Sequence, residues 1–124
     1  MAASNEFVTH CLELFAPLGA VRSRRMFGGH GFYVDDLFIA LIAYDQLFLK
    51  IDAQTRSRFE AAGCVPFVYE AKGDRLVSVN YFSAPQDAME SPTLMLPWAR
   101  MALEAALRAR AAKTKPAKAR KPKP

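Results

Sequence analysis

Four side chains that could take part in acid–base chemistry lie close together in the sequence, around a cluster of glycines. They are His30, Tyr33, Asp35 and Asp36. General acid–base catalysis needs two such groups within hydrogen-bonding reach and with pKa values suited to the reaction. Adjacent aspartates are also what an ordinary hairpin turn uses. The turn is the preferred interpretation, so we expect no catalytic residue and no enzyme.

Cysteine and histidine offer little further chemistry. Cys11 and Cys64 are the two cysteines of the chain, and each stands in an apolar context, as buried free thiols usually do. A zinc site would need paired Cys or His ligands at short spacings, and neither His10 nor His30 supplies one. A Ser-centred nucleophile elbow, a zinc-binding helix and a Walker loop are also missing from the sequence. We therefore expect no metal and no cofactor.

Three arginines, Arg22, Arg24 and Arg25, precede the glycine cluster. On a strand, Arg22 and Arg24 would share one face and Arg25 would take the other. Two arginines that project together could hold a phosphate or an acidic partner. Alternatively, they belong to a solvated edge strand whose charges prevent pairing with another sheet. The edge strand is the preferred interpretation, and the anion or partner contact remains open.

Two explanations are also open for the glycines Gly28, Gly29 and Gly31. Glycine inside a strand usually marks a bulge or a close approach of two backbones. A loop that cradles phosphate needs glycines between a strand and a helix, whereas strands stand on both sides here. A bulge is therefore favoured over an anion site.

The last twelve residues, KTKPAKARKPKP, hold all the excess positive charge. They contain no acid and six basic residues: Lys113, Lys115, Lys118, Arg120, Lys121 and Lys123. The composition predicts a disordered polycation. Contacts between lysine and phosphate release counterions but read no bases, so we expect non-specific binding to nucleic acid. Alternatively, the tail is a solubilising extension.

The rest of the chain is a near-neutral body. Residues 1–112 carry eleven basic and twelve acidic side chains, although the formal charge of the whole chain is +5. The length of 124 residues and a hydrophobic content of 52% predict one domain with a substantial core. Apolar runs are too short to span a membrane, and the N-terminus has no signal-peptide pattern. We expect a soluble, cytoplasmic protein with one domain (residues 1–112) and a tail (residues 113–124).

Alternation of apolar and turn residues defines the elements that must position these side chains. A three-strand meander is predicted at residues 26–32, 37–44 and 47–51, and a second hairpin at residues 66–70 and 76–82. Helices are predicted at residues 5–18, at residues 52–62, and from Ser91 onward. The order αβββαββα predicts a two-layer α+β sandwich, with a five-stranded antiparallel sheet and the helices packed mainly on one face.

Two details of this arrangement lead to further expectations. In the last helix, Leu94, Trp98, Met101 and Ala105 form one apolar stripe, and Pro97 should separate a short turn from a longer helix over about residues 97–112. Residues 37–43 are apolar at every position, so both faces of that strand should be covered. A dimer partner, a client protein or a crossing helix would each provide the cover.

Several segments together resemble one known family. They are RRMFGGHGFYVDD with LFIALI and YDQLFLKID, the run FEAAGCVPFVYEAKG, the pairs Tyr81-Phe82 and Ala84-Pro85, and the stretch from Ser91-Pro92 through Leu96-Pro97-Trp98 to Ala105. In this order, over about residues 5–110, they are similar to the TfoX N-terminal domain, which Sxy-type regulators of bacterial competence share. The resemblance implies a small fold like that of secretion chaperones. It supplies no catalytic residues.

The resemblance also implies a function. Full-length TfoX/Sxy proteins resemble transcriptional coactivators that work with a cyclic-AMP receptor protein, and they carry a second, C-terminal domain. We expect this chain to be a stand-alone N-terminal domain without it. The expected function is regulatory, with the folded domain binding a protein partner of the transcription machinery and the tail contacting nucleic acid. The alternative is a protein-interaction or chaperone-like module with no role in nucleic-acid binding.

Overall fold

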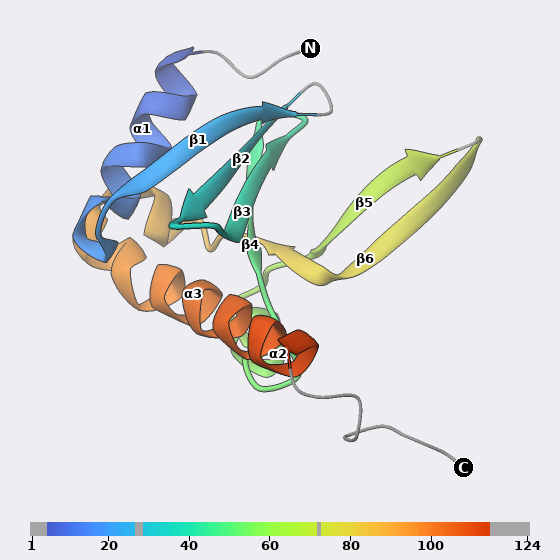
Figure 1. Ribbon diagram of the computed structural model, residues 1–124. Coiled ribbons are helices and arrows are strands. Elements are labelled where there is room, and N and C mark those ends of the chain that lie inside the picture. Colours follow the sequence, from blue (N-terminus) through green and yellow to red (C-terminus); the bar gives the residue numbers. More distant parts are fainter. Residues whose placement is uncertain (1–4, 27–28, 72, 115–124) are drawn as a thin grey trace.

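The computed structural model describes residues 5–26, 29–71 and 73–114, and Figure 1 shows how their elements are arranged. Three α-helices, two 3₁₀-helices and six strands are found in these residues. In chain order they are α1 (Asn5–Phe15), η1 (Ala16–Leu18), β1 (Val21–Met26), β2 (Gly29–Val34), β3 (Leu37–Ala43), β4 (Gln46–Lys50), α2 (Arg56–Ala61), β5 (Pro66–Ala71), β6 (Asp74–Ser83), η2 (Asp87–Glu90) and α3 (Pro92–Thr114).

All described strands belong to one antiparallel sheet with the order β1-β2-β3-β4-β6-β5. The α+β class is confirmed, but the prediction of five strands and the order αβββαββα is wrong. The additional strand is β1, which pairs with β2 from Val21 to Met26. Its four consecutive polar or charged positions, Arg22 to Arg25, hide the strand pattern. They are tolerated because β1 is an edge strand, and charge at an edge discourages pairing with other chains.

The helices cover one face of this sheet, as predicted. α3 packs on β3 and β4, and α1 packs on α3 and β1. α2 joins the same side, since the ring centroid of Phe59 lies 4.9 Å from that of Trp98 on α3 and 6.5 Å from that of Phe82 on β6. The core between the layers is built from large side chains that are almost completely buried, among them Phe15, Phe32, Ile42, Leu49 and Phe82. Within the described residues, no helix combines the length and the apolar character needed to cross a membrane.

The buried stripe of α3 differs from the predicted one by a single position. The side chains in the core are Met95, Ala99, Ala102 and Ala106, together with Ala105, whereas Leu94 is exposed. The larger Trp98 and Met101 flank this stripe and are only partly buried. Alanine occupies the contact with the sheet because a small side chain lets the helix axis approach the sheet closely.

The prediction that Pro97 interrupts this helix is wrong, because α3 is continuous from Pro92 to Thr114. A proline in the second turn removes one hydrogen bond, to the carbonyl four residues earlier. That carbonyl belongs to Thr93, and both Thr93 and Pro97 are exposed. Water can satisfy the carbonyl there, so the helix continues with little loss.

Two features of the structure explain why β3 is apolar at every position. The register between β2 and β3 shifts after the pair Phe32 and Ala40, which makes Ile39 an additional residue of a bulge. Ile39 and Ala40 are consecutive and both fully buried. Phe38 and Leu41 lie on the face of β3 that points away from the helices, and both are half-buried. No described helix crosses to that face.

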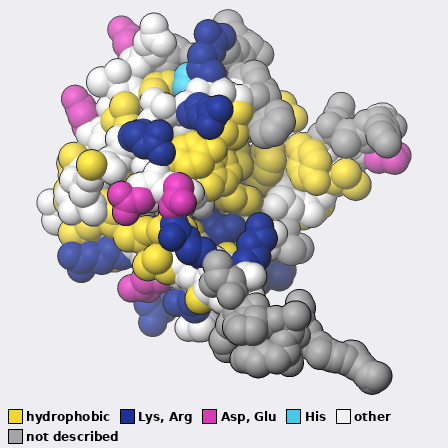
Figure 2. Space-filling model, viewed as in Figure 1, with side chains coloured by type: hydrophobic (Ala, Val, Ile, Leu, Met, Phe, Trp, Pro, Cys, Tyr) yellow, Lys and Arg dark blue, Asp and Glu magenta, His cyan; other side chains and the backbone are white. Residues whose placement is uncertain are grey.

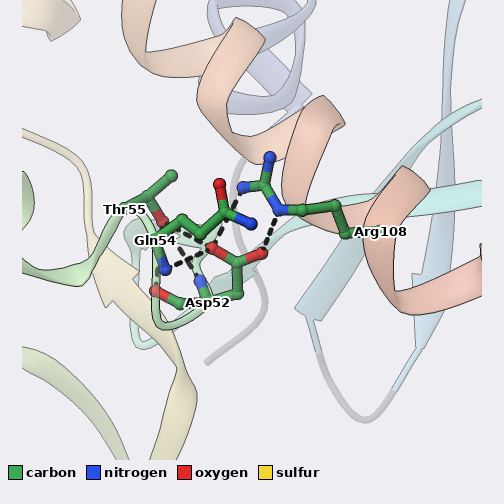
Figure 3. Close-up of polar contacts among 4 residues, drawn as sticks. All are labelled: Asp52, Gln54, Thr55 and Arg108. Atoms are coloured by element: carbon green, nitrogen blue, oxygen red, sulfur yellow. Dashed lines mark hydrogen bonds and ion pairs between the residues drawn. The ribbon is translucent and has the colours of Figure 1, made fainter. Parts of the chain in front are cut away.

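An ion pair fastens the second half of α3 to the loop after β4 (Figure 3). Nε and Nη2 of Arg108 donate to the two carboxylate oxygens of Asp52, at 2.6 and 3.0 Å. The same carboxylate accepts the backbone N–H of Gln54, and the Asp52 carbonyl accepts the N–H groups of Thr55 and Arg56. The helix predicted at residues 52–62 starts later, and the cap position of α2 is Thr55. Asp52 instead organises the turn before it and holds α3.

We predict that Asp52→Asn lowers the free energy of unfolding by about 1 kcal/mol at neutral pH, because a two-pronged charge-assisted bond becomes a neutral one and both side chains are partly solvated. Hydrogen bonding by Arg108 lowers the pKa of Asp52 below its usual value. The stabilisation is therefore complete above the unfolded-state pKa of about 3.9 and disappears as pH falls through the lower folded-state pKa.

Urea unfolding of the two proteins between pH 3 and 7 measures this difference. Asp36→Asn is the matched control, because Asp36 pairs with Arg110 on the same helix but is far more exposed, and its loss should matter much less. Equal effects of the two substitutions would contradict the role assigned to Asp52.

Candidate functional site on the uncovered sheet face

The face of the sheet opposite α1 and α3, called the open face below, carries a mixed aromatic and basic surface. Partners directly across an antiparallel sheet share a face, so the register assigns its residues. They are Arg22, Arg24 and Met26 on β1, Gly31 and Tyr33 on β2, Phe38 and Leu41 on β3, Phe48 and Lys50 on β4, and Tyr81 on β6. The core partners Phe32, Ala40, Leu49 and Phe82 occupy the alternate positions.

The arginines of β1 divide between the two faces as the sequence predicted. Arg22 pairs with Tyr33 and Arg24 with Gly31 on the open face, whereas Arg25 pairs with the buried His30. Nη2 of Arg22 donates to the Asp35 carbonyl at 2.7 Å, and its guanidinium carbon lies 5.7 Å from the centroid of the Tyr33 ring. The first arginine is thus oriented by two contacts. β1 forms one end of the sheet, so the predicted edge position is confirmed.

Three aromatic rings form a row across the middle of the open face. The centroids of Tyr33 and Phe38 are 5.1 Å apart, and those of Phe38 and Tyr81 are 5.8 Å apart. The Lys50 ammonium lies 5.1 Å from the centroid of Tyr81. The row therefore has a basic side chain at each end, Arg22 over Tyr33 and Lys50 over Tyr81. All three rings are half-buried, so part of each faces solvent.

A second aromatic group continues from β4 onto the hairpin of β5 and β6. The ring of Phe67 lies 4.9 Å from that of Phe48 and stacks on Tyr69 at 5.4 Å. It also lies 6.4 Å from the ring of Tyr44, whose side chain is 68% exposed. In Figure 2, hydrophobic side chains gather near the centre of the view, between Lys and Arg side chains and the projecting hairpin.

Two glycines of β2 leave room for neighbouring side chains and backbone to pack closely against this strand. A Cβ atom on Gly31 would lie 2.3 Å from a ring carbon of Phe38 and 2.9 Å from the methyl carbon of Met26. A Cβ atom on Gly29 would lie 2.0 Å from the backbone oxygen of Ile42. Both glycines thus permit close approach, as expected, while the bulge itself lies beside them at Phe32 and Tyr33. Gly28 lies outside the described residues.

The charge of the open face is entirely basic within the register positions named above. Burial lowers the pKa of Lys50, with Asp52 raising it and Lys113 at the end of α3 lowering it further. Burial, and then the neighbouring Tyr33, raises the pKa of Tyr81 to about 12, so its hydroxyl stays protonated at physiological pH. The face therefore presents neutral rings between cations.

The acid–base candidates around the glycines do not form a catalytic group. His30 is buried on the helix side of β2, and no partner of its Nδ1 is found in the described residues. Tyr33 lies on the opposite face. Asp35 has a positive φ of 55° in the turn, and Asp36 pairs with Arg110. The preferred interpretation of the two aspartates as a turn agrees with this geometry.

The two thiols are buried and poorly suited to nucleophilic attack. Burial raises the pKa of Cys11 to about 12 and also raises the pKa of Cys64, although a hydrogen bond from Ser83 opposes the latter shift. Cys64 borders a hollow of about 470 Å³ whose other lining side chains include Phe7, Gln46 and Met89. Among the described residues, no group of three or more His, Cys, Asp or Glu could hold a metal ion.

Of the basic tail, the structure describes only Lys113 and Thr114. Lys113 belongs to α3, which continues through Thr114, so the helix extends past the predicted boundary at residue 112. The other predicted contacts to nucleic acid lie outside the described residues: Lys115, Lys118, Arg120, Lys121 and Lys123.

Sequence reasoning found Arg22 and Arg24 but missed the row that they adjoin. Phe38, Lys50 and Tyr81 come from three strands, and only the pairing of β4 with β6 brings Lys50 opposite Tyr81. The alternation of Phe48 and Lys50 with Leu47 and Leu49 was a usable signal, because it places an aromatic and a basic residue on one face.

The model of the TfoX N-terminal domain family matches residues 13–106. The DNA transformation protein TfoX1 of Aliivibrio fischeri is 30% identical to this chain over 87 residues. The match includes 70% of this chain and 41% of that protein, so the chain spans about two fifths of the length of this relative.

We predict that Gly31→Ala destabilises the protein by about 1–3 kcal/mol, because the new methyl group forces the Phe38 ring and Met26 to move. Phe38→Leu removes the ring atom in closest contact. The double variant Gly31→Ala/Phe38→Leu should therefore lose less than the sum of the two single changes, as a double-mutant cycle of unfolding free energies can measure. Strict additivity would show that the ring does not lie over Gly31.

Proposed function

Because this chain belongs to the TfoX N-terminal domain family, we propose that it is a non-enzymatic regulatory protein that acts in competence for DNA transformation. The family match over residues 13–106 carries this proposal. The name of the Aliivibrio fischeri relative, a DNA transformation protein, supports the same process. A regulatory role also fits two buried thiols with raised pKa values and acid–base candidates separated between the two faces of the sheet.

The folded domain would act by binding a protein partner of the transcription machinery, and the hairpin of β5 and β6 is the surface that we propose for it. β4 pairs with β6 only at Tyr81, Phe82 and Ser83, so the rest of the hairpin projects from the body (Figure 1). Val77 is 57% exposed and Leu76 is 41% exposed on this projection. β5 ends the sheet, and its outer backbone groups could pair with a strand of the partner.

The tail would hold the regulator near nucleic acid. Six Lys or Arg residues without an acid are found in residues 113–124. Such a segment binds phosphate groups without reading bases, so the protein partner would supply the sequence specificity. If the tail serves only solubility, the alternative function is a protein-interaction or chaperone-like module, which the exposed apolar hairpin would equally serve.

We predict a clear salt signature for the tail on duplex DNA. The test variant replaces Lys115, Lys118, Arg120, Lys121 and Lys123 with Gln in the full-length chain. Each lost phosphate contact flattens the log–log dependence of affinity on salt by about 0.9, so the slope should become less steep by about 4.5. Fluorescence anisotropy with a duplex oligonucleotide at several salt concentrations measures it. Identical slopes for both proteins would remove the tail from nucleic-acid binding and leave the interaction module.

We further predict that Val77→Asp lowers transformation frequency at least about tenfold in the host organism, because a carboxylate cannot be buried in an apolar interface. Val77→Thr keeps the branched shape and should retain most activity. Thermal unfolding of the purified variants checks that the domain stays folded, since exposed substitutions usually change stability by about 0.5 kcal/mol or less. Normal transformation by the Val77→Asp strain would exclude the hairpin as the partner surface.

A further inference from the structure

We propose that the open face binds single-stranded nucleic acid, with bases stacked on the row of Tyr33, Phe38 and Tyr81 and phosphates held by Arg22, Arg24 and Lys50. This site is separate from the projecting part of the hairpin, which carries Leu76 and Val77, and from the basic tail. The proposal does not depend on the proposed function.

The rings provide the stacking platform. Neighbouring centroids in the row are separated by 5.1 and 5.8 Å, and each ring is half-buried with part of its surface in solvent. Aromatic rings held on a rigid sheet stack on unpaired bases of any sequence, because every base has a π face. A duplex keeps its bases paired and stacked internally, so it cannot use such a platform.

Cations stand beside these rings in the arrangement that a nucleotide chain requires. The Arg22 guanidinium lies 5.7 Å from the Tyr33 centroid, and the Lys50 ammonium lies 5.1 Å from the Tyr81 centroid. A base that takes the place of either cation over its ring would leave the displaced positive charge next to its own phosphate. Arg24 adds a third, exposed cation two residues along β1 from Arg22.

The open face is basic, although the folded body as a whole is not. Residues 1–112 carry a net charge of −1, yet the charged residues at the open-face register positions, Arg22, Arg24 and Lys50, are all basic. A polyanion is therefore the complementary ligand. A second copy of the chain is disfavoured as the occupant, because two such faces packed together would oppose cation to cation.

The end of α3 brings more positive charge to the same place. Lys113 is close enough to Lys50 to lower the pKa of its ammonium group. α3 ends at Thr114, and residues 115–124 contain five further Lys or Arg. Phosphate bound beside Lys50 would relieve the repulsion between the two lysines. The basic tail thus starts at the border of the open face.

The test uses the full-length chain with the five Gln replacements in the tail, so that the tail and the open face are measured separately. The probes are a fluorescein-labelled twelve-residue oligothymidylate, an abasic oligomer of the same length and charge, and a duplex of the same length. Oligothymidylate should bind at least about fivefold more tightly than either of the others, which corresponds to about one stacked base. Equal affinity for oligothymidylate and the abasic oligomer, or no binding at all, would overturn the proposal.

Two pairs of variants in the same background locate the site. Tyr33→Leu and Phe38→Leu remove a ring while keeping an apolar side chain, and each should lower oligothymidylate affinity about fivefold while leaving abasic binding unchanged. Arg24→Gln and Arg25→Gln are neighbours on β1 and are both exposed, but only Arg24 lies on the open face.

Arg24→Gln should weaken binding at least about threefold more than Arg25→Gln. This comparison stays informative even if a ring variant fails to fold. Equal effects of the two arginine substitutions, or unchanged binding by folded ring variants, would overturn the assignment.

Discussion

The contact between the alanine stripe of α3 and the sheet is the constraint on which the rest of this structure depends. Met95, Ala99, Ala102 and Ala106 place the helix close against β3 and β4, and the Asp52–Arg108 pair fixes its second half. Small side chains gain little apolar burial individually, but they allow close approach over the length of the helix. All the α-helices described lie on this side, so the opposite face must be stable without helical cover.

The open face meets that requirement with aromatic rings and long basic side chains. The rings of Tyr33, Phe38 and Tyr81 bury part of their area against one another, while Arg22 and Lys50 cover more of it with their charged groups close by. Such a surface is apolar enough to stabilise the strands and charged enough to discourage self-association. The same compromise creates the features that unpaired bases and phosphates recognise, so stability and binding have a common origin.

Local patterns predicted most of the fold, and distant pairings account for what was missed. Turn residues located β2, β3 and β4, and strand alternation assigned Arg22 and Arg24 to one face correctly. An edge strand carrying the three arginines was expected, but β1 was not counted as a separate strand of the sheet, because the alternation disappears where an edge is charged. The stripe of α3 was misplaced by one position because hydrophobicity favours Leu94 and Trp98, whereas close packing selects alanine. The aromatic row depends on β4 pairing with β6 across α2 and β5, which no local pattern reveals.

Chemical-shift mapping tests the central claim that the uncovered face of the sheet is the ligand surface. In the protein with the neutralised tail, amide resonances would be followed as the twelve-residue oligothymidylate is added. We expect shifts concentrated at open-face positions of β1, β2, β3, β4 and β6, with α1 and the buried stripe of α3 unchanged. Shifts confined to the helical layer, or to the projecting part of the hairpin around Leu76 and Val77, would contradict it.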